Sequence, residues 1–488
     1  MPGVSGEVIR APAHPSQNRL IVGIVLAVVT FWLFAQTTLN VAPTIREDLR
    51  ISDSVSNIAV SIAALFSGIF IVAAGSFADR FGRVKLTYVG LGLNAVGSLL
   101  IAISPTGTAS FLITGRIIQG LSAACIMPAT LALLKDSFDG KERQRAVSFW
   151  SIGSWGGSGL CALFGGVIAS SLGWRWIFWM SIAVTAVSAF LLRGTAESKV
   201  SSAAHRRFDW PGFIAFIIAM VALNVVIGQG DALGWSNPTI IGLALLCVIA
   251  TVVFFRVESG RSDGFVDLTL FANSTYTGAT LSNFLLNGAA GTLLVTLTLV
   301  QQGAGLSSFQ AGLLTIGYLI AILGTIRVGE KLLQRRGARW PMLMGCAITG
   351  VGILLTTLTF LLIRQYLIAA FAGFTLFGIG LGLYATPSTD AALSNVPAEK
   401  AGAASGIYKM ASSLGAALGV AISAAVFTAL SGLGGELVPL SDVFLGRTDN
   451  VDIRFAGAVA LLFNVLMVVV AMVAIARTVP RRGASVGG

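Results

Sequence analysis

The segment Gly75-Ser-Phe-Ala-Asp79-Arg80-Phe-Gly82-Arg83-Val-Lys85 separates two long apolar runs of the chain. Its glycines permit close backbone approach and a tight turn. Asp79 lies beside Arg80 and Arg83 at the edge of an apolar run, where a carboxylate can hold a basic partner and face the positive N-terminal end of a nearby helix. The segment therefore predicts two bilayer-spanning helices joined by a charged turn. From these residues alone, a conformational latch and a structural salt bridge in an ordinary basic loop are equally good interpretations.

The composition of the whole chain supports a membrane protein. Of its 488 residues, 55% are hydrophobic and only 11% are charged, with a mean hydropathy of +0.85. A soluble protein of this size could not cover its surface with so few charges. The four cysteines lie inside apolar runs and both histidines lie outside them. This distribution predicts no metal site, no cofactor and no disulfide framework.

Apolar runs long enough to cross a bilayer recur along the chain, and we expect fourteen transmembrane helices. They lie at about residues 20–42, 57–78, 87–104, 110–134, 147–170, 176–192, 210–228, 238–256, 275–301, 308–329, 341–363, 366–391, 404–430 and 455–475.

Basic residues indicate the orientation of these helices. Of the 32 lysines and arginines, 24 lie in segments on the N-terminal side of the bilayer and 6 in the opposite loops. This asymmetry predicts a multi-pass protein of the cytoplasmic (inner) membrane with both termini in the cytoplasm. It also explains the net charge of +11 without nucleic-acid binding.

The order of the runs predicts an all-α membrane protein with two six-helix lobes and two inserted helices. A second glycine-bounded basic loop, Gly329 to Arg339, follows the second run of the second half. Chance could also produce one such loop, but two parallel halves are typical of transporters that rock about a central site. The expected divisions are a disordered cytoplasmic tail at 1–19, the N-terminal lobe at 20–194, a linker with two extra helices at 195–271, the C-terminal lobe at 272–478 and a cytoplasmic tail at 479–488.

Few ionisable residues interrupt the apolar runs. Arg116 lies well inside the fourth run, where an arginine needs a polar interior, and it could serve either function or structure. Asp390 and Lys409 lie in consecutive long runs at similar distances from the loop between them. A buried, unpaired lysine is costly. We therefore expect Asp390 and Lys409 to interact and to take part in proton coupling or gating. Asp231, near the outer end of the seventh run, is a further candidate for that role.

Amides are expected to line a central cavity. Gln36 and Asn40 share a helical face in the first run, and Asn283 and Asn287 repeat that spacing in the ninth. Gln119, near Arg116, adds to this polar set. Hydrogen bonding between helices is an equally good interpretation of such residues.

The fifth run carries small residues at intervals of four, Gly153, Gly157, Cys161 and Gly165, followed by Gly166. Such a stripe predicts close helix packing, which would also seal the region between the lobes against proton leak.

Several of these segments resemble the major facilitator superfamily. The segment from Gly75 to Lys85 resembles its signature loop, and Arg116-x-x-Gln119-Gly120 resembles its buried-arginine motif. Trp174-Arg175-Trp176 resembles the start of the sixth helix in the 14-span drug:proton antiporter branch. The stretches 120–130, 150–159 and 384–390 are similar to the quinolone-resistance exporters of that branch.

This resemblance implies roles for the residues that carry it. It implies that the Asp79 loop stabilises the outward-facing state and that Arg116 takes part in proton coupling. The sequence departs from the branch at Ala35, where an acid is usual, and at Cys161-Ala162, where a Gly-Pro pair is usual. The first departure leaves open which acid carries the proton: Asp390 lies clearly inside a span, Asp231 lies near an outer end and Asp79 at an inner edge. The second departure puts the usual helix kink in doubt.

The leading hypothesis is therefore a monomeric multidrug efflux transporter that exports amphipathic, zwitterionic, quinolone-like compounds by proton antiport. The partners of such a protein are its small-molecule substrate, protons and the bilayer. The alternative is an exporter of a native metabolite, lipid or sugar with incidental drug efflux. An enzyme would need paired acids, histidine clusters or a nucleophile–base set within the runs, and a channel would need a filter-like segment. The sequence shows neither, nor the nucleotide-binding loop that ATP coupling needs.

Overall fold

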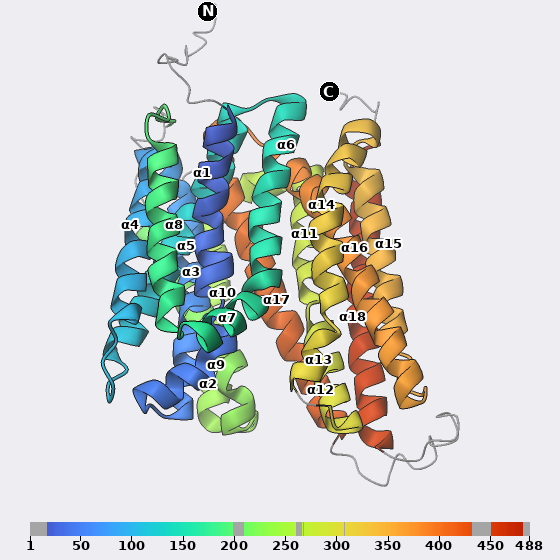
Figure 1. Ribbon diagram of the computed structural model, residues 1–488. Coiled ribbons are helices and arrows are strands. Elements are labelled where there is room, and N and C mark those ends of the chain that lie inside the picture. The colour runs from blue at the N-terminus through green and yellow to red at the C-terminus, as the bar shows by residue number, and fades with distance from the viewer. Residues whose placement is uncertain are drawn as a thin grey trace, which may run out of the picture.

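The protein is a bundle of long, roughly parallel helices in a computed structural model (Figure 1) that describes residues 17–198, 209–259, 266, 268–306, 308–431 and 450–481. Thirteen helices in this part are long and apolar enough to cross a membrane. A fourteenth span is formed by two helix segments, Gly140–Cys161 and Leu163–Ser171, that meet at a bend of 53°. The predicted all-helical, fourteen-span architecture is confirmed.

The N-terminal spans pack on one another and are called the N lobe here. Its elements are α1 (Gln17–Val29), the π-helical turn η1 (Thr30–Ala35), α2 (Thr38–Leu49), α3 (Asp53–Phe81), α4 (Arg83–Ala102), α5 (Ser110–Ser137), α6 (Gly140–Ser151), the π-helical turn η2 (Ile152–Gly156), α7 (Gly157–Ser171) and α8 (Arg175–Leu192).

The C-terminal spans form a second packed group, called the C lobe. It contains α11 (Ser274–Gly288), α12 (Gly291–Ala304), α13 (Ser308–Leu313), α14 (Ile316–Arg336), α15 (Arg339–Thr356), α16 (Ile363–Ser394), α17 (Ala401–Ser431) and α18 (Val451–Thr478), with short 3-10 helices at Leu268–Ala272 and Ala398–Lys400. Between the lobes in sequence lie α9 (Trp210–Leu233) and α10 (Pro238–Glu258), which pack against each other.

Helix α1 begins and α18 ends at the same end of the bundle (Figure 1), as an even number of spans requires. We call this the terminal end and the opposite one the distal end. Helix α1 begins at Gln17, inside the predicted tail 1–19, whose residues 1–16 lie outside the described residues. Residues 199–208 and 260–265 of the linker and 482–488 of the last tail also lie outside them, so those domain boundaries stay predictions.

The two lobes meet along two seams. At one seam α3 and α5 of the N lobe pack against α17, and at the other α6 packs against α14 and α16. Helix α17 crosses the middle of the bundle obliquely (Figure 1). The residues along these two seams position the candidate functional site.

Candidate functional site

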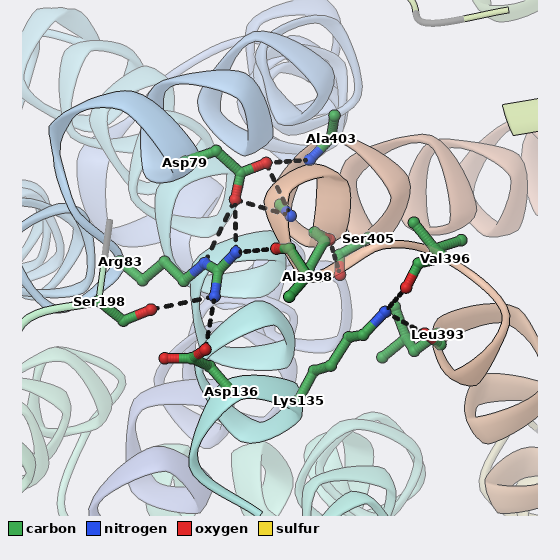
Figure 2. Close-up of polar contacts among 12 residues, drawn as sticks. Asp79, Arg83, Lys135, Asp136, Ser198, Leu393, Val396, Ala398, Ala403 and Ser405 are labelled. Atoms are coloured by element: carbon green, nitrogen blue, oxygen red, sulfur yellow. Dashed lines mark hydrogen bonds and ion pairs between the residues drawn. The ribbon is translucent and has the colours of Figure 1, made fainter. Parts of the chain in front are cut away.

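At the terminal end, Asp79 of the N lobe caps a helix of the C lobe. Both of its carboxylate oxygens accept hydrogen bonds from the backbone N–H of Gly402 at 3.0 Å, and Oδ2 accepts another from Ala403 N–H at 3.1 Å (Figure 2). These N–H groups belong to the first turn of α17, where no helical carbonyl is available to them. The negative charge of Asp79 also complements the positive end of the α17 dipole.

Arg83 completes this contact from the first turn of α4. Its Nε and Nη2 donate to Oδ1 of Asp79 at 3.2 and 2.9 Å, and Nη2 also donates to the carbonyl of Ala398 at 2.6 Å. The side chains of Arg83 and Asp79 are only 2% and 6% exposed. We call Asp79, Arg83 and the first turn of α17 the terminal latch. The structure thus gives the predicted carboxylate both a basic partner and a helix N-terminus.

Glycines make this approach possible. A methyl group at Gly75 would overlap the carbonyl oxygen of Gly402, and one at Gly402 would overlap that of Gly75. Gly82 adopts φ +117°, a conformation that few residues other than glycine reach, and turns the chain between α3 and α4. Arg80, half-buried, lies next to Asp79 in the last turn of α3.

A second polar contact closes the same end of the bundle. Lys135 at the end of α5 donates to the carbonyls of Leu393, at 2.5 Å, and Val396. These carbonyls lie at and just beyond the C-terminal end of α16, where a cation is favourable. Arg143 of α6 donates to Asp390 Oδ1 at 3.2 Å, and Gln144 donates to Oδ2 at 3.3 Å. The lobes are thus joined by hydrogen bonds and ion pairs at both seams of the terminal end.

The expected interaction of Asp390 with Lys409 is therefore wrong. Asp390 lies only one turn from the end of α16, which continues to Ser394, and it pairs across the lobes with Arg143. Lys409 lies two turns inside α17, deeper in the bundle. The different depths of the two residues give them different partners.

Lys409 instead faces the N lobe at the edge of a cavity. Its Nζ lies 4.2 Å from the ring centroid of Trp150 in α6, an arrangement in which the aromatic face stabilises an ammonium. A cavity of about 120 Å³ adjoins it, lined by Phe31, Trp32 and Gln36 of the N lobe. Among the described residues that line this cavity, Lys409 is the only ionisable one.

Arg116 is buried next to the cavity wall and is fully engaged by backbone carbonyls. Its guanidinium donates to the carbonyls of Ala59 and Ala35 at 2.8 Å and to that of Val60 at 3.2 Å. Nη1 also donates to Gln119 Oε1 at 2.9 Å. Ala35 ends the π-helical turn of the first span, so Arg116 joins α5 to α3 and to the irregular turn next to Gln36.

Four of the five predicted cavity-lining residues have other roles. Gln119 is buried and bonded to Arg116 and Ser98, and Asn40 lies beside the sulfur of Cys161 at 3.6 Å. Asn283 donates to the carbonyl of Tyr408 and to Ser412, and Asn287 donates to Asn283. Only Gln36 lines the cavity. Asn40, Gln119 and Asn283 form the helix-to-helix hydrogen bonds that were the alternative interpretation, whereas the bonds of Asn287 stay within α11.

The fifth span is kinked although it has no proline. Its two segments meet at Ala162, where the bend is 53° and a π-helical turn lies one to two turns before it. Thr37 of the first span donates to the carbonyl of Cys161 at 3.0 Å. Such competition for helix carbonyls, together with π-helical turns, is a known cause of kinks.

The glycine stripe of this span packs within the N lobe. Gly153 and Gly157 contact α1 and η1, and a methyl at Gly165 would overlap Thr37. The expectation that this stripe seals the lobes against each other is wrong, because its glycines face the N lobe. The neighbouring Gly156 and Gly159, which are not part of the stripe, are the glycines that face Leu323 and Leu319 of the C lobe. Gly166 has no neighbour within 4 Å at its Cβ position and does not pack as predicted.

Asp231 belongs to α9, but its side chain lies outside the described residues.

Sequence reasoning did not assign a contact or a role at the site to Lys135, Arg143, Gln144 or Trp150. The two basic residues entered it only as part of the charge asymmetry between loops. Their positions at the end of α5 and in the first turn of α6 would have suggested contacts with helix ends of the facing lobe. Trp150 carried no polar signal at all.

Comparison with known proteins gives a consistent result. The family model described as Major Facilitator Superfamily matches residues 24–420 and 279–487. The chain is 52% identical over 416 residues to the Quinolone resistance protein NorB of Staphylococcus aureus strain MRSA252, a match that covers 85% of this chain and 89% of that protein. The protein of the same name from strain MW2 is 52% identical over 421 residues, or 86% and 90% of the two chains.

Solved structures share the fold at low sequence identity. The proton:xylose symporter XylE has a TM-score of 0.64 at 16% identity, covering 95% of this chain and 96% of that one. The human organic anion transporter MFSD10 has a TM-score of 0.62 at 14% identity, covering 93% and 100%.

Proposed function

The chain belongs to the major facilitator superfamily, and from this premise we propose that it exports amphipathic, zwitterionic compounds of the quinolone type in exchange for protons. The proposal places it in the cytoplasmic membrane with its terminal end in the cytoplasm, as the excess of basic residues on that side favours. The described structure, with its terminal latch formed, then corresponds to an outward-facing state. The 52% identity to proteins named for quinolone resistance supports the substrate class.

The observation that carries this proposal is Lys409 beside the cavity. Aromatic and aliphatic walls fit the apolar body of an amphipathic molecule, and a small number of polar groups orient it. Gln36 and Ser413 supply hydrogen-bond donors that suit a carboxylate. Trp150, whose face the ammonium of Lys409 occupies, is buried outside the cavity lining, so the aromatic faces that suit the amine of a zwitterion are those of Phe31 and Trp32.

This arrangement suggests how proton and substrate exclude each other. A protonated Lys409 and a substrate ammonium would be like charges in one small, low-dielectric cavity, which is unfavourable. Substrate binding from the cytoplasm therefore favours neutral Lys409. When the site faces outward, a proton binds Lys409 and expels the substrate. Lys409 thus takes the place of the acid that is usual at Ala35 as the proton carrier.

The other ionisable residues act on the conformational change in this proposal. Arg116 holds the turn that carries Gln36, through the carbonyl of Ala35. Asp390 and the terminal latch close the cytoplasmic side of the cavity. Asp231 stays a candidate for coupling near the distal end.

A proton-release measurement tests the proposal. Proteoliposomes with an acidic interior receive a zwitterionic quinolone, and the interior pH is followed. Wild type is expected to release protons, whereas Lys409→Met is expected to bind the drug without moving protons. Lys141→Met, which removes an exposed lysine in the first turn of α6, is the matched control and should behave as wild type.

Two results would overturn parts of this proposal. If no compound causes wild type to move protons, the antiport mechanism is wrong. If only quaternary ammonium compounds do so, the substrate class is wrong.

A further inference from the structure

The inserted helix α9 carries an apolar stripe along one face. Phe213, Phe216, Met220, Leu223 and Ile227 follow one another at intervals of three or four residues, which places them on one side of the helix. Such a stripe needs a partner along its whole length, and α9 finds two different kinds of partner.

The part of the stripe nearer the terminal end is filled by aromatic rings. Phe213 packs against Phe70 of α3 with ring centroids 6.0 Å apart, and Phe216 packs against Phe254 of α10 at 5.7 Å. Phe213 and Phe216 are both buried. Here α9 is fastened to the N lobe and to its partner helix.

The part nearer the distal end faces the cavity. Met220, Leu223 and Ile227 line it, together with Lys409, Ser412 and Ser413 of α17. The stripe of α9 therefore contributes to the same space as the candidate proton carrier.

The cavity opens at this point because α3 and α17 separate. They touch closely at Gly75 and Gly402, where each glycine lies against the backbone of the other helix. Two turns further along α3, a methyl group at Gly68 would meet no atom within 4 Å. Gly68 lines the cavity, as does Ala417 of α17. Helix α9, which contacts both α3 and α17, closes the gap between them.

Helix α10 lies on the outer side of α9. Leu245, Val248 and Ile249 are 58–60% exposed, as expected for side chains that face lipid. Its main partner in the structure is α9. The order from the cavity outward is thus α9, α10 and the bilayer.

We propose that α9 is a wall of the substrate site, and that Met220, Leu223 and Ile227 select the length of the apolar substituent of the substrate. The inference rests on the proposed export function and extends it to the inserted helices. It assigns the aliphatic or aromatic body of the substrate to α9 and its polar groups to α17. Helices α9 and α10 are then a selecting element rather than a spacer between the lobes.

Binding of a graded ligand series tests this assignment. A set of N-alkyl quinolones of increasing chain length is titrated against purified full-length protein, and the dissociation constants give the best-bound length. Leu223→Ala enlarges the site and is expected to shift the optimum to longer chains. Leu223→Phe fills the site and is expected to shift it to shorter chains. Near the optimum, each methylene added to or removed from the ligand chain should change the dissociation constant by roughly four- to tenfold.

The control lies on another face of the same helix. Ile218→Ala removes a side chain of similar size that is 39% exposed, and it should leave the preferred length unchanged. Because one Leu223 variant enlarges and the other fills the site, the opposite signs of the two shifts separate selection from damage to the fold.

The outcomes for α9 and for the export function are distinguishable. If wild type and both Leu223 variants prefer the same length, α9 does not select the substrate, even when wild type exports drugs and moves protons. If wild type binds the series with shifted optima in the variants but moves no protons, the α9 assignment stands and antiport fails. If wild type binds no member of the series, both are overturned.

Discussion

The two seams between the lobes are built from different interactions although they occupy corresponding positions. The seam of α3 with α17 combines backbone contact at Gly75 and Gly402 with a buried carboxylate that caps a helix. At the second seam, Leu319 and Leu323 of α14 pack against Gly159 of α7 and Gly156 of η2, and Arg327 of α14 lies over the ring of Phe149 in α6 at 4.6 Å. The first seam depends on a buried helix-capping carboxylate and on fixed backbone geometry. The second depends, apart from the Arg143–Asp390 ion pair, on side chains that can adjust. We therefore expect the first seam to determine when the terminal end opens.

Opening can be measured at one position for all variants. Ala403→Cys in a chain whose native cysteines are replaced by serine reports exposure at the start of α17 to a membrane-impermeant maleimide added at the terminal end. A tenfold change in labelling rate corresponds to about 1.4 kcal/mol in the equilibrium between closed and open forms.

The largest effect is expected for Asp79→Asn. The substitution leaves Arg83 buried without its carboxylate and removes the charge that faces the α17 dipole. Breaking one side of a buried pair costs about 3–5 kcal/mol, so labelling should rise by roughly a hundredfold or more. Asp136→Asn is the control, since Asp136 is 39% exposed and its oxygen lies 3.7 Å from Arg83. Equal labelling of Asp79→Asn and wild type would show that the terminal latch does not hold this seam closed.

A smaller opening is expected for Gly75→Ala. The added methyl group would overlap the carbonyl oxygen of Gly402, and neither backbone can move without separating the helices. Overpacking of this kind costs about 1–3 kcal/mol, which predicts labelling roughly ten- to a hundredfold faster. Gly68→Ala on the same helix meets no atom within 4 Å and should label as wild type. If the two variants label alike, close backbone contact is not what holds α3 to α17.

Asp390→Asn should have a still smaller effect. The amide oxygen can still accept a hydrogen bond from Arg143, whose side chain is 17% exposed, so mainly the charge is lost. We expect labelling to rise about fivefold, for a cost of about 1 kcal/mol. An effect as large as that of Asp79→Asn would mean that the α6–α16 contact is as important as the terminal latch.

The smallest effect is expected for Gly156→Ala. Its methyl group would meet the end of the Leu323 side chain, which can change rotamer. Labelling should stay within about threefold of wild type, and Leu323→Ala in the same chain should remove the remaining difference. A large effect that Leu323→Ala does not relieve would contradict the distinction between the two seams.

Short-range features of the sequence predicted part of this site correctly. The spans follow from the length of the apolar runs, and the terminal latch follows from Gly75, Asp79 and Arg83, which are close together in sequence. The partner of Asp390 could not be predicted in this way. It depends on where α16 ends and on which residue of α6 lies opposite, and neither depends on sequence near Asp390. The cavity was expected between amide-bearing spans, but three apolar residues of α9 line it and leave no polar signal in the sequence.

The central claim is that the lobes move about the cavity so that the terminal and distal ends open in turn. Distances between spin labels test it most directly, with one pair at the terminal end, on Phe81 and Arg335, and one at the distal end, on Thr106 and Arg364, all exposed positions. Measured in lipid with and without a zwitterionic quinolone, at neutral and acidic pH, the two distances are expected to change in opposite directions. If both distances stay fixed, or both lengthen together, the lobes do not alternate and the account is wrong.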